Sequence, residues 1–440
     1  LIGVSSKKKG SVTNIEKGIF TSCKINEKCP SWSIQAKNIK HNKTKKQIIY
    51  DNAFLRIYDF PILYFPKFFH PDPSVERQSG LLKPLLNNSH ILGSSITLPY
   101  YIANELNKDF TLTPTLFDKN MQMLQLEYRQ VDKKYNLITD FGVVNNYKSS
   151  QFANEKSITH LFGRFNADLN LKNFLSSKLN FVYEKVSNDT YLKIFDANIT
   201  NNTVRPKNFD VLNSEIKLSL KHENYDFTTG FQSYEDLGIN NSDRYQFVLP
   251  YFKFNKVLAK NIKKGSLNLS SEGTNELKNT NNLKTRLINN ISYKGFDFVS
   301  DLGIKNNINF SLKNLNSLGK NDTEYKSSPQ IELMSNFEIN SSLPLEKKNK
   351  NFNNYITPKI SFKFNPGDMK NYSSSTEKKI NIDNVFLNNR LGISDSYEAG
   401  RSLTLGVEYK KESLEDINKY FEMKLATVLR DKEEKNIPKI

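Results

Sequence analysis

Alternation of apolar and polar residues with a period of two recurs along the chain from about Phe152 onward. It is clearest in Leu161–Asn170, Glu215–Lys221 and Leu403–Lys410. This period belongs to strands with one apolar and one polar face. The pattern therefore predicts an all-β chain.

The polar stretches between these runs predict turns and loops. They include Glu235–Asp243, Gly273–Asn282 and Lys347–Asn354. A strand of about ten residues tilted near 45° rises roughly 23 Å, which matches the apolar band of an outer-membrane barrel. A soluble β-sandwich would alternate too, but no second hydrophobic face for a covering sheet is evident. We therefore expect a large antiparallel transmembrane β-barrel, incomplete here, with roughly 14 to 18 strands.

Residues 1–66 carry shorter alternating runs at close spacing, such as Trp32–Ala36 and Ala53–Ile57. Such runs predict a stacked or jelly-roll β module. Its apolar residues of one parity are Ile34, Ala36, Ala53, Leu55 and Ile57. An apolar face of this kind either lines a groove for acyl chains or forms an ordinary closed core, which a small domain needs for its own stability.

Prolines mark the segment that follows. Pro66, Pro71 and Pro73 cannot donate to a strand ladder, so we expect a junction at 67–92 and the partial barrel at 93–440. Two more prolines, Pro99 and Pro114, fall in consecutive strand patterns at the start of the barrel. They either weaken a seam there or simply start and end strands.

Composition narrows the class of protein. The chain has 440 residues, a net charge of +17 and 12% aromatic residues. It holds no stretch of 18 apolar residues, which excludes a helical membrane protein. The basic charge invites a nucleic-acid reading, but lysines are spread through nearly every loop without a compact stripe. We expect no nucleic-acid partner, and a share of this charge attracts phosphates instead.

Signals for catalysis are missing from the sequence. The five histidines, His41, His70, His90, His160 and His222, show no metal-ligand spacing, and no nucleophile elbow or phosphate-binding loop occurs. Two cysteines, Cys23 and Cys29, fit neither a zinc site nor a redox pair. We expect no enzyme, no cofactor and no metal. The chain starts at Leu1 with no signal peptide, so we expect a fragment whose localisation must be inferred from its fold.

One motif is specific to a family. Pro66–Pro84 closely resembles the junction of the LPS-assembly outer-membrane protein family, LptD (OstA). Weaker similarity extends over nearly the whole chain, through Thr21–Cys23, Trp32–Ala36, Leu98–Tyr101, Leu112–Pro114, Asn384–Phe386, Asn389–Gly392 and Glu398–Gly406.

The resemblance implies a non-enzymatic transporter of the outer membrane with its N-terminal module in the periplasm. Members receive lipopolysaccharide from a periplasmic bridge protein (LptA-like) and pass it along an apolar groove. The lipid then leaves through a lateral gate beside prolines that match Pro99 and Pro114, while a lipoprotein (LptE-like) plugs the barrel. Cys23 matches a family cysteine that bridges to the end of the barrel, although a local Cys23–Cys29 disulfide stays open.

Two other classes compete with this interpretation. A general outer-membrane porin would share the barrel but lack residues 1–92. A secreted β-rich adhesin would predict an internal repeat of fixed period, which the sequence does not contain, and no aromatic girdles at strand ends.

Overall fold

The computed structural model describes residues 3–21, 32–57, 60–72, 74–75, 77–118, 120–149, 152–262, 265–416 and 418–438. These residues form an almost entirely β structure, with the four-residue helix α1 (Tyr191–Ile194) and the 3₁₀ turn η1 (Ser242–Arg244). None of the helices in this part of the chain is long and apolar enough to cross a membrane. The all-β fold class is confirmed.

The chain divides into two compact units. Unit 1 comprises Leu1–Asp132, Leu137–Leu161 and Val186–Arg205, and unit 2 comprises Lys133–Asn136, Phe162–Lys185 and Pro206–Ile440. The domain limits expected from the sequence, 1–66, 67–92 and 93–440, stay a prediction.

Unit 1 begins with an antiparallel sheet of five strands in chain order. They are β1 (Ser5–Lys9), β2 (Val12–Phe20), β3 (Trp32–Asn42), β4 (Gln47–Ile57) and β5 (Phe60–Pro71). Within the described residues β5 pairs with β4 alone. This edge position explains how β5 tolerates Pro61, Pro66 and Pro71, which lack the N–H that an inner strand needs.

At one level of this sheet, the pairing between neighbouring strands passes over one residue in each of the strands β2, β3, β4 and β5. The skipped residues are Lys17, Lys37, Asn52 and Pro66. Lys17 and Asn52 have positive φ, 49° and 51°. Because side chains alternate along a strand, each skip reverses which parity points to the apolar face.

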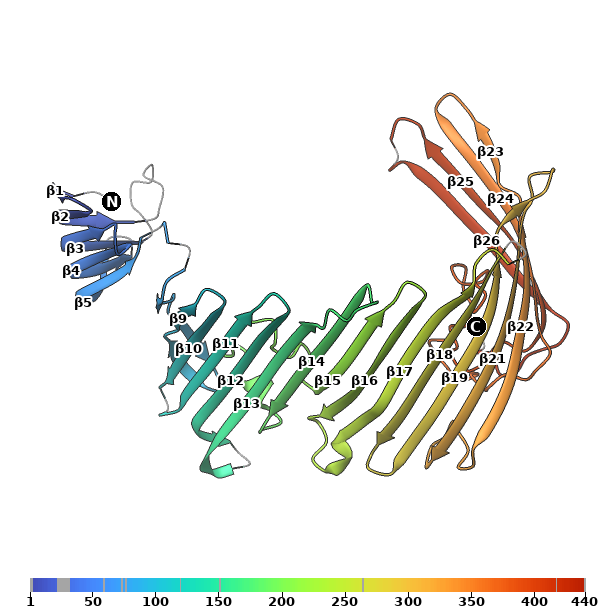
Figure 1. Ribbon diagram of the computed structural model, residues 1–440, viewed down its shortest axis with the longest axis horizontal. Helices are drawn as coiled ribbons and strands as arrows, with labels where there is room; N and C mark the ends of the chain where they lie inside the picture. The colour runs from blue at the N-terminus through green and yellow to red at the C-terminus, as the bar shows by residue number, and fades with distance from the viewer. Residues whose placement is uncertain are drawn as a thin grey trace. The chain divides into compact units, whose positions relative to one another are not determined.

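The other strands, β6 to β26, are antiparallel to their hydrogen-bonded neighbours, and together they are called the large sheet (Figure 1). They are β6 (Gly80–Leu81), β7 (Leu85–Ser89), β8 (Gly93–Thr97), β9 (Tyr100–Glu105), β10 (Lys108–Phe117), β11 (Gln122–Val131), β12 (Tyr135–Ser149), β13 (Phe152–Asp168), β14 (Ser176–Val186), β15 (Val211–Lys221), β16 (Tyr225–Asp236), β17 (Tyr245–Ala259), β18 (Gly265–Lys278), β19 (Asn282–Gly295), β20 (Phe298–Val299), β21 (Lys305–Lys320), β22 (Gln330–Ser342), β23 (Leu345–Lys348), β24 (Phe352–Asn365), β25 (Gly400–Ser413) and β26 (Tyr420–Arg430). Fifteen of those described have ten residues or more, in line with the expected number. β20 and β23 are short pieces beside longer strands, so β19 pairs with β21 and β22 pairs with β24.

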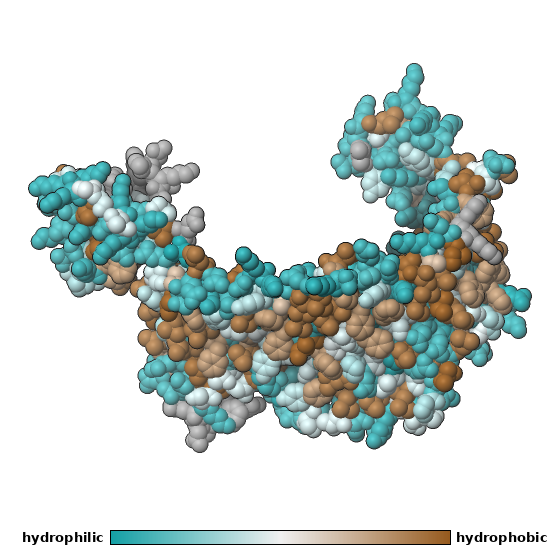
Figure 2. Space-filling view, viewed as in Figure 1, coloured by the Kyte–Doolittle hydropathy of each residue, from teal (hydrophilic) through white to brown (hydrophobic). Residues whose placement is uncertain are grey.

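In unit 2 this sheet exposes its apolar face. Ile308 of β21 pairs with Ile339 of β22, which pairs with Phe362 of β24, and these three side chains are 37–38% exposed. On the opposite face Glu338 pairs with Lys363, and both are at most 5% exposed. A water-soluble sheet does the reverse, whereas a barrel wall in a membrane turns its apolar residues outward to lipid. Figure 2 shows hydrophobic side chains gathered over the middle of the strands of unit 2.

Two stretches predicted as loops are largely strand. Gly273–Lys278 completes β18, and most of Lys347–Asn354 belongs to β23 and β24, so the turns shrink to 279–281 and 349–351. The prediction was wrong because strand ends beyond the apolar band meet water on one face and the polar interior on the other. Both faces are then polar, and the alternation disappears.

Two long connections fold back over the polar face of their own unit. In unit 1, the segment after β14 places Phe195, which is fully buried, against Phe117 and Tyr147. In unit 2, the segment 366–399 covers β21, where Lys313 Nζ donates to the carbonyl of Ser394 at 2.7 Å. The polar face is therefore covered by the chain itself at both places.

Candidate functional site

The apolar face of the β1–β5 sheet contains most of the predicted groove residues. Ile34, Ala36 and Ala53 are buried in one cluster, and Leu55 packs against them. The ladder pairs Ile34 with Leu55 and Ala36 with Ala53, so these four side chains share a face. The side chain of Ile57 lies outside the described part of the chain. A lipid-binding role for this face stays a prediction.

The opposite face of the same strands carries polar side chains beside Phe54, which is 43% exposed. Arg56 follows Leu55 in β4, and its Nη1 donates to Gln35 Oε1 of β3 at 2.5 Å. Leu55 and Arg56 are therefore neighbours in sequence that point to opposite faces.

The apolar face is longer than the sequence indicates. Its further buried members are Ile39, Ile48 and Tyr50, and its partly buried members are Ile15, Phe20, Trp32, Phe65 and Phe68. Parity reasoning missed Ile39, Ile48 and Tyr50 because the skipped residues reverse the alternation within β3 and β4. The available signal was a polar pair interrupting each strand, Lys37-Asn38 and Asp51-Asn52.

One end of this face is aromatic and holds a polar pair, the buried Tyr50 and the half-buried His70. His70 Nδ1 lies 2.6 Å from the carbonyl oxygen of Pro71, which can only accept, so Nδ1 carries the proton. The Tyr50 hydroxyl then donates to His70 Nε2 at 2.6 Å. Burial lowers the pKa of His70 and raises that of Tyr50, which keeps both side chains neutral. The Phe20 ring lies 4.6 Å from the His70 ring.

Pro99 and Pro114 meet at one interruption of the large sheet. Pro99 lies between β8 and β9, and Pro114 lies within β10. The pairing of β10 with β8 ends at Thr115 opposite Thr97, and its pairing with β9 resumes only at Leu112. Across the gap the N–H of the residue before Pro99 donates to the Pro114 carbonyl at 3.0 Å. Pro114 has no N–H to return to the residue before Pro99, so the ladder between β10 and the chain at Pro99 lacks one donor at this level.

Residues that the sequence assigns to the junction pair with β8 and β9 on both sides of this interruption. β6 pairs with β9 at Gly80–Tyr101 and Leu81–Tyr100, and β7 pairs with β8. The Leu82 N–H donates to the carbonyl of Pro99 at 2.8 Å. The sequence analysis missed these strands because they are too short to show alternation.

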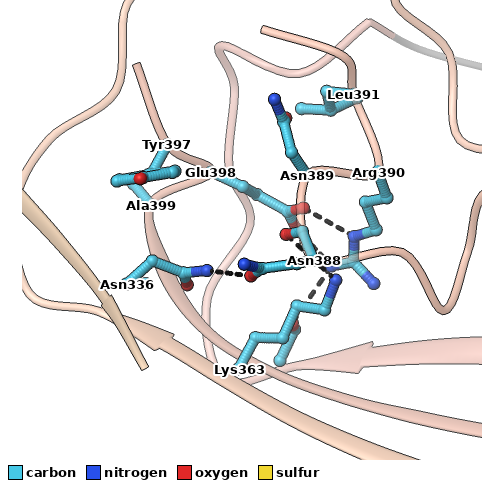
Figure 3. Close-up of a pocket in the computed structure, with 11 residues that line it drawn as sticks. Asn336, Lys363, Asn388, Asn389, Arg390, Leu391, Tyr397, Glu398 and Ala399 are labelled. Carbon is cyan, nitrogen blue, oxygen red and sulfur yellow. Dashed lines mark hydrogen bonds and ion pairs between the residues drawn. The ribbon is translucent and has the colours of Figure 1, made fainter. Parts of the chain in front are cut away.

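A buried ionic cluster holds the segment 366–399 against unit 2 (Figure 3). The Arg390 side chain is fully buried, and its Nε donates to Glu398 Oε2 at 2.5 Å. Lys363 Nζ donates to the carbonyl of Leu387, and Asn336 Nδ2 donates to Asn388 Oδ1 at 2.6 Å. The cavity between these residues measures only about 10 Å³, which holds at most a water molecule. The cluster is therefore a structural attachment.

Unit 1 has a similar attachment around a histidine. His160 Nδ1 lies 2.8 Å from the Tyr191 hydroxyl, and Nε2 lies 3.3 Å from Asp140 Oδ1. Asn202 Nδ2 donates to the other oxygen of Asp140 at 2.7 Å. Tyr191 and Asn202 both belong to the segment after β14, so these contacts fix that segment to β12 and β13.

Among the residues that the structure describes, no group of three or more His, Cys, Asp or Glu side chains gathers as metal ligands. Cys23 and Cys29, the two disulfide candidates, lie outside the described residues.

These features define a class: an all-β protein of the outer membrane whose sheet turns apolar side chains to lipid. Comparison with known proteins adds the family. The family model described as LPS transport system D matches residues 159–438. The LPS-assembly protein LptD of Legionella pneumophila (strain Lens) is 28% identical over 244 residues, which cover 51% of this chain and 27% of that protein. Those of Pseudoalteromonas translucida and Pseudomonas fluorescens are 29% and 25% identical over 186 and 257 residues, covering 42% and 58% of this chain and 23% and 26% of those proteins.

The chain belongs to the LptD family, because the family model matches well over half of it. It spans about a quarter of the length of the curated relatives described above. The family predicted from the sequence is confirmed, by a match that lies outside the junction motif.

Proposed function

We propose that this chain is part of a transporter that delivers lipopolysaccharide to the outer leaflet of the outer membrane. In this proposal residues 1–66 are the end of a periplasmic module, 67–92 the junction, and 93–440 part of the barrel. The observation that carries the proposal is the apolar face shared by Ile34, Ala36, Ala53 and Leu55. Relatives that share the family are named LPS-assembly proteins.

The lipid moves with its acyl chains against this apolar face and leaves sideways at the interruption between Pro99 and Pro114. Opening a sheet breaks fewest hydrogen bonds where its ladder is already interrupted. No bond of the lipid is made or broken, so the protein is not an enzyme and needs no cofactor. The partners are a periplasmic bridge protein (LptA-like) at the N-terminal module and a plug lipoprotein (LptE-like) inside the barrel.

Site-specific photo-crosslinking in cells tests the proposal. The probe replaces Leu55 or Arg56 in the full-length parent protein, so two adjacent positions serve as site and matched control. We expect a lipopolysaccharide adduct at Leu55 and none at Arg56, because the two side chains point to opposite faces. Adducts at neither position, with the protein in the outer membrane, would mean that the apolar face is a plain core.

A further inference from the structure

The Arg77 side chain attaches the junction to the turn of the β9–β10 hairpin. Its guanidinium donates five hydrogen bonds to this hairpin. The acceptors are the Tyr101 hydroxyl at 2.5 Å, the carbonyls of Glu105, Leu106 and Lys108 at 2.6, 2.5 and 2.6 Å, and Asp109 Oδ2 at 2.8 Å. Three of the five are backbone carbonyls around the turn between the two strands.

Only arginine can make this set of contacts. A guanidinium presents five N–H groups in a rigid planar fork, whereas a lysine ammonium has three donors on a flexible stem. Asp109 is a shared acceptor, because Arg129 Nε also donates to it, at 2.7 Å. The Arg129 side chain pairs with the carboxylates of Asp109 and Glu127 and not with the turn carbonyls, so it offers a matched control for charge alone.

The attachment continues from Arg77 toward the interruption with the two prolines. Ser79 Oγ accepts a hydrogen bond from the Ala103 N–H at 2.8 Å. Gly80 and Leu81 then pair with β9, and Leu82 reaches the carbonyl of Pro99. The junction thus follows the outer edge of β9, with Arg77 at one end of the contact and Pro99 at the other.

We propose that Arg77 is a positioning residue of the lipid exit. It locks the β9–β10 hairpin to the junction, so that the strands beside Pro99 and Pro114 keep their register when the sheet opens. This role rests on the proposed transport function. A two-residue ladder such as β6–β9 has little stability of its own, so without Arg77 the junction separates from β9.

The test uses the full-length parent protein in cells. Leu81→Cys with Tyr100→Cys places a cysteine pair at directly paired positions of β6 and β9, and the yield of their disulfide reports the attachment. We compare Arg77→Ala, Arg77→Lys and Arg129→Ala in this background. Surface lipopolysaccharide is measured with the same variants at equal outer-membrane protein levels in the absence of the cysteine pair.

We expect the disulfide yield to fall about tenfold in Arg77→Ala, the scale of losing charge-assisted hydrogen bonds. Arg77→Lys behaves like Arg77→Ala, because it keeps the charge and loses the fork, whereas Arg129→Ala keeps the wild-type yield. Surface lipopolysaccharide falls in both Arg77 variants. An unchanged disulfide yield in Arg77→Ala overturns the lock, and a reduced yield with normal surface lipopolysaccharide overturns its role in transport.

The photo-crosslink at Leu55 separates this inference from the proposed function. In Arg77→Ala the lipid adduct at Leu55 is retained, because the defect lies after the apolar face. Absence of the adduct even with Arg77 present defeats the transport proposal, while the disulfide yield still decides whether Arg77 locks the hairpin.

Discussion

At the scale of single residues, buried charged side chains hold segments of the chain together. Arg390 is the clearest case. Besides Glu398, its guanidinium donates to Thr404 Oγ1 and Ser402 Oγ, each at 3.0 Å. A buried charge is tolerated only when it is paired and its hydrogen bonds are satisfied. The segment 366–399 and strand β25 are thereby tied together through one side chain.

Replacing Arg390 with methionine should loosen that segment. The change leaves Glu398 with Arg430 as its remaining partner. We therefore expect the free energy of unfolding to fall by an amount near the lower end of the roughly 3–5 kcal/mol known for broken buried ion pairs. Faster proteolysis within 366–399, with the strands intact, is the readout. Lys348→Met is the control, because its side chain is 74% exposed, and a change there should stay within about 0.5 kcal/mol. Equal protease resistance in the two variants would contradict the attachment.

At the scale of elements, two features interrupt the regular pattern of the strands. The residue skipped in each strand of the N-terminal sheet lets the apolar face continue while its parity reverses. Gly18 lies next to this skip, where a Cβ would come within 2.4 Å of Ile39 Cδ1, so any larger residue there would displace the buried Ile39 side chain. In the large sheet, Pro114 instead removes an N–H donor on the side of β8 and β9, and Pro99 removes one on the side where Leu82 bonds its carbonyl.

Replacing both prolines with alanine should strengthen the sheet at this level. Pro99→Ala with Pro114→Ala restores two N–H donors, and we expect less lipopolysaccharide at the cell surface with the protein level unchanged. Pro358→Ala is the control, since Pro358 also lies inside a strand, paired with Val407, but far along the chain from the interruption. Wild-type surface lipopolysaccharide in the double variant would mean that the prolines do not serve the exit.

At the scale of the whole molecule, the polarity of the large sheet is inverted relative to a soluble protein. In β22, Ile339 is 37% exposed beside Glu338, which is 1% exposed. The hydrophobic effect then stabilises the folded strands by contact with lipid, and the interior holds the polar groups.

Adjacent positions of β22 test this inversion. Ile339→Lys places a charge on the lipid face and should cost up to about 2–4 kcal/mol, depending on depth. Asn340→Lys, one residue on, points into a cavity of about 330 Å³ and should be tolerated. Folding yield in lipid vesicles, read from heat-modifiable migration of the full-length protein, compares the two variants. Equal yields would contradict the assignment of the two faces.

The sequence by itself determined the features that depend on neighbours along the chain. Alternation identified strands such as β15 and β25, and it placed Ile34, Ala36, Ala53 and Leu55 on one face, because a strand repeats every two residues. The junction motif identified the family, which the family model confirms.

Only the tertiary structure decided features that depend on residues far apart in the chain. The skipped residues become visible only when the ladders are paired. β6 and β7 exist because β9 and β8 offer them an edge, and neither is long enough to show a pattern. Arg77 meets the hairpin turn some 30 residues later, and Arg390 is buried only because 366–399 folds back. Local alternation carries no information about such contacts, since they arise from long-range packing and from the lipid outside the sheet.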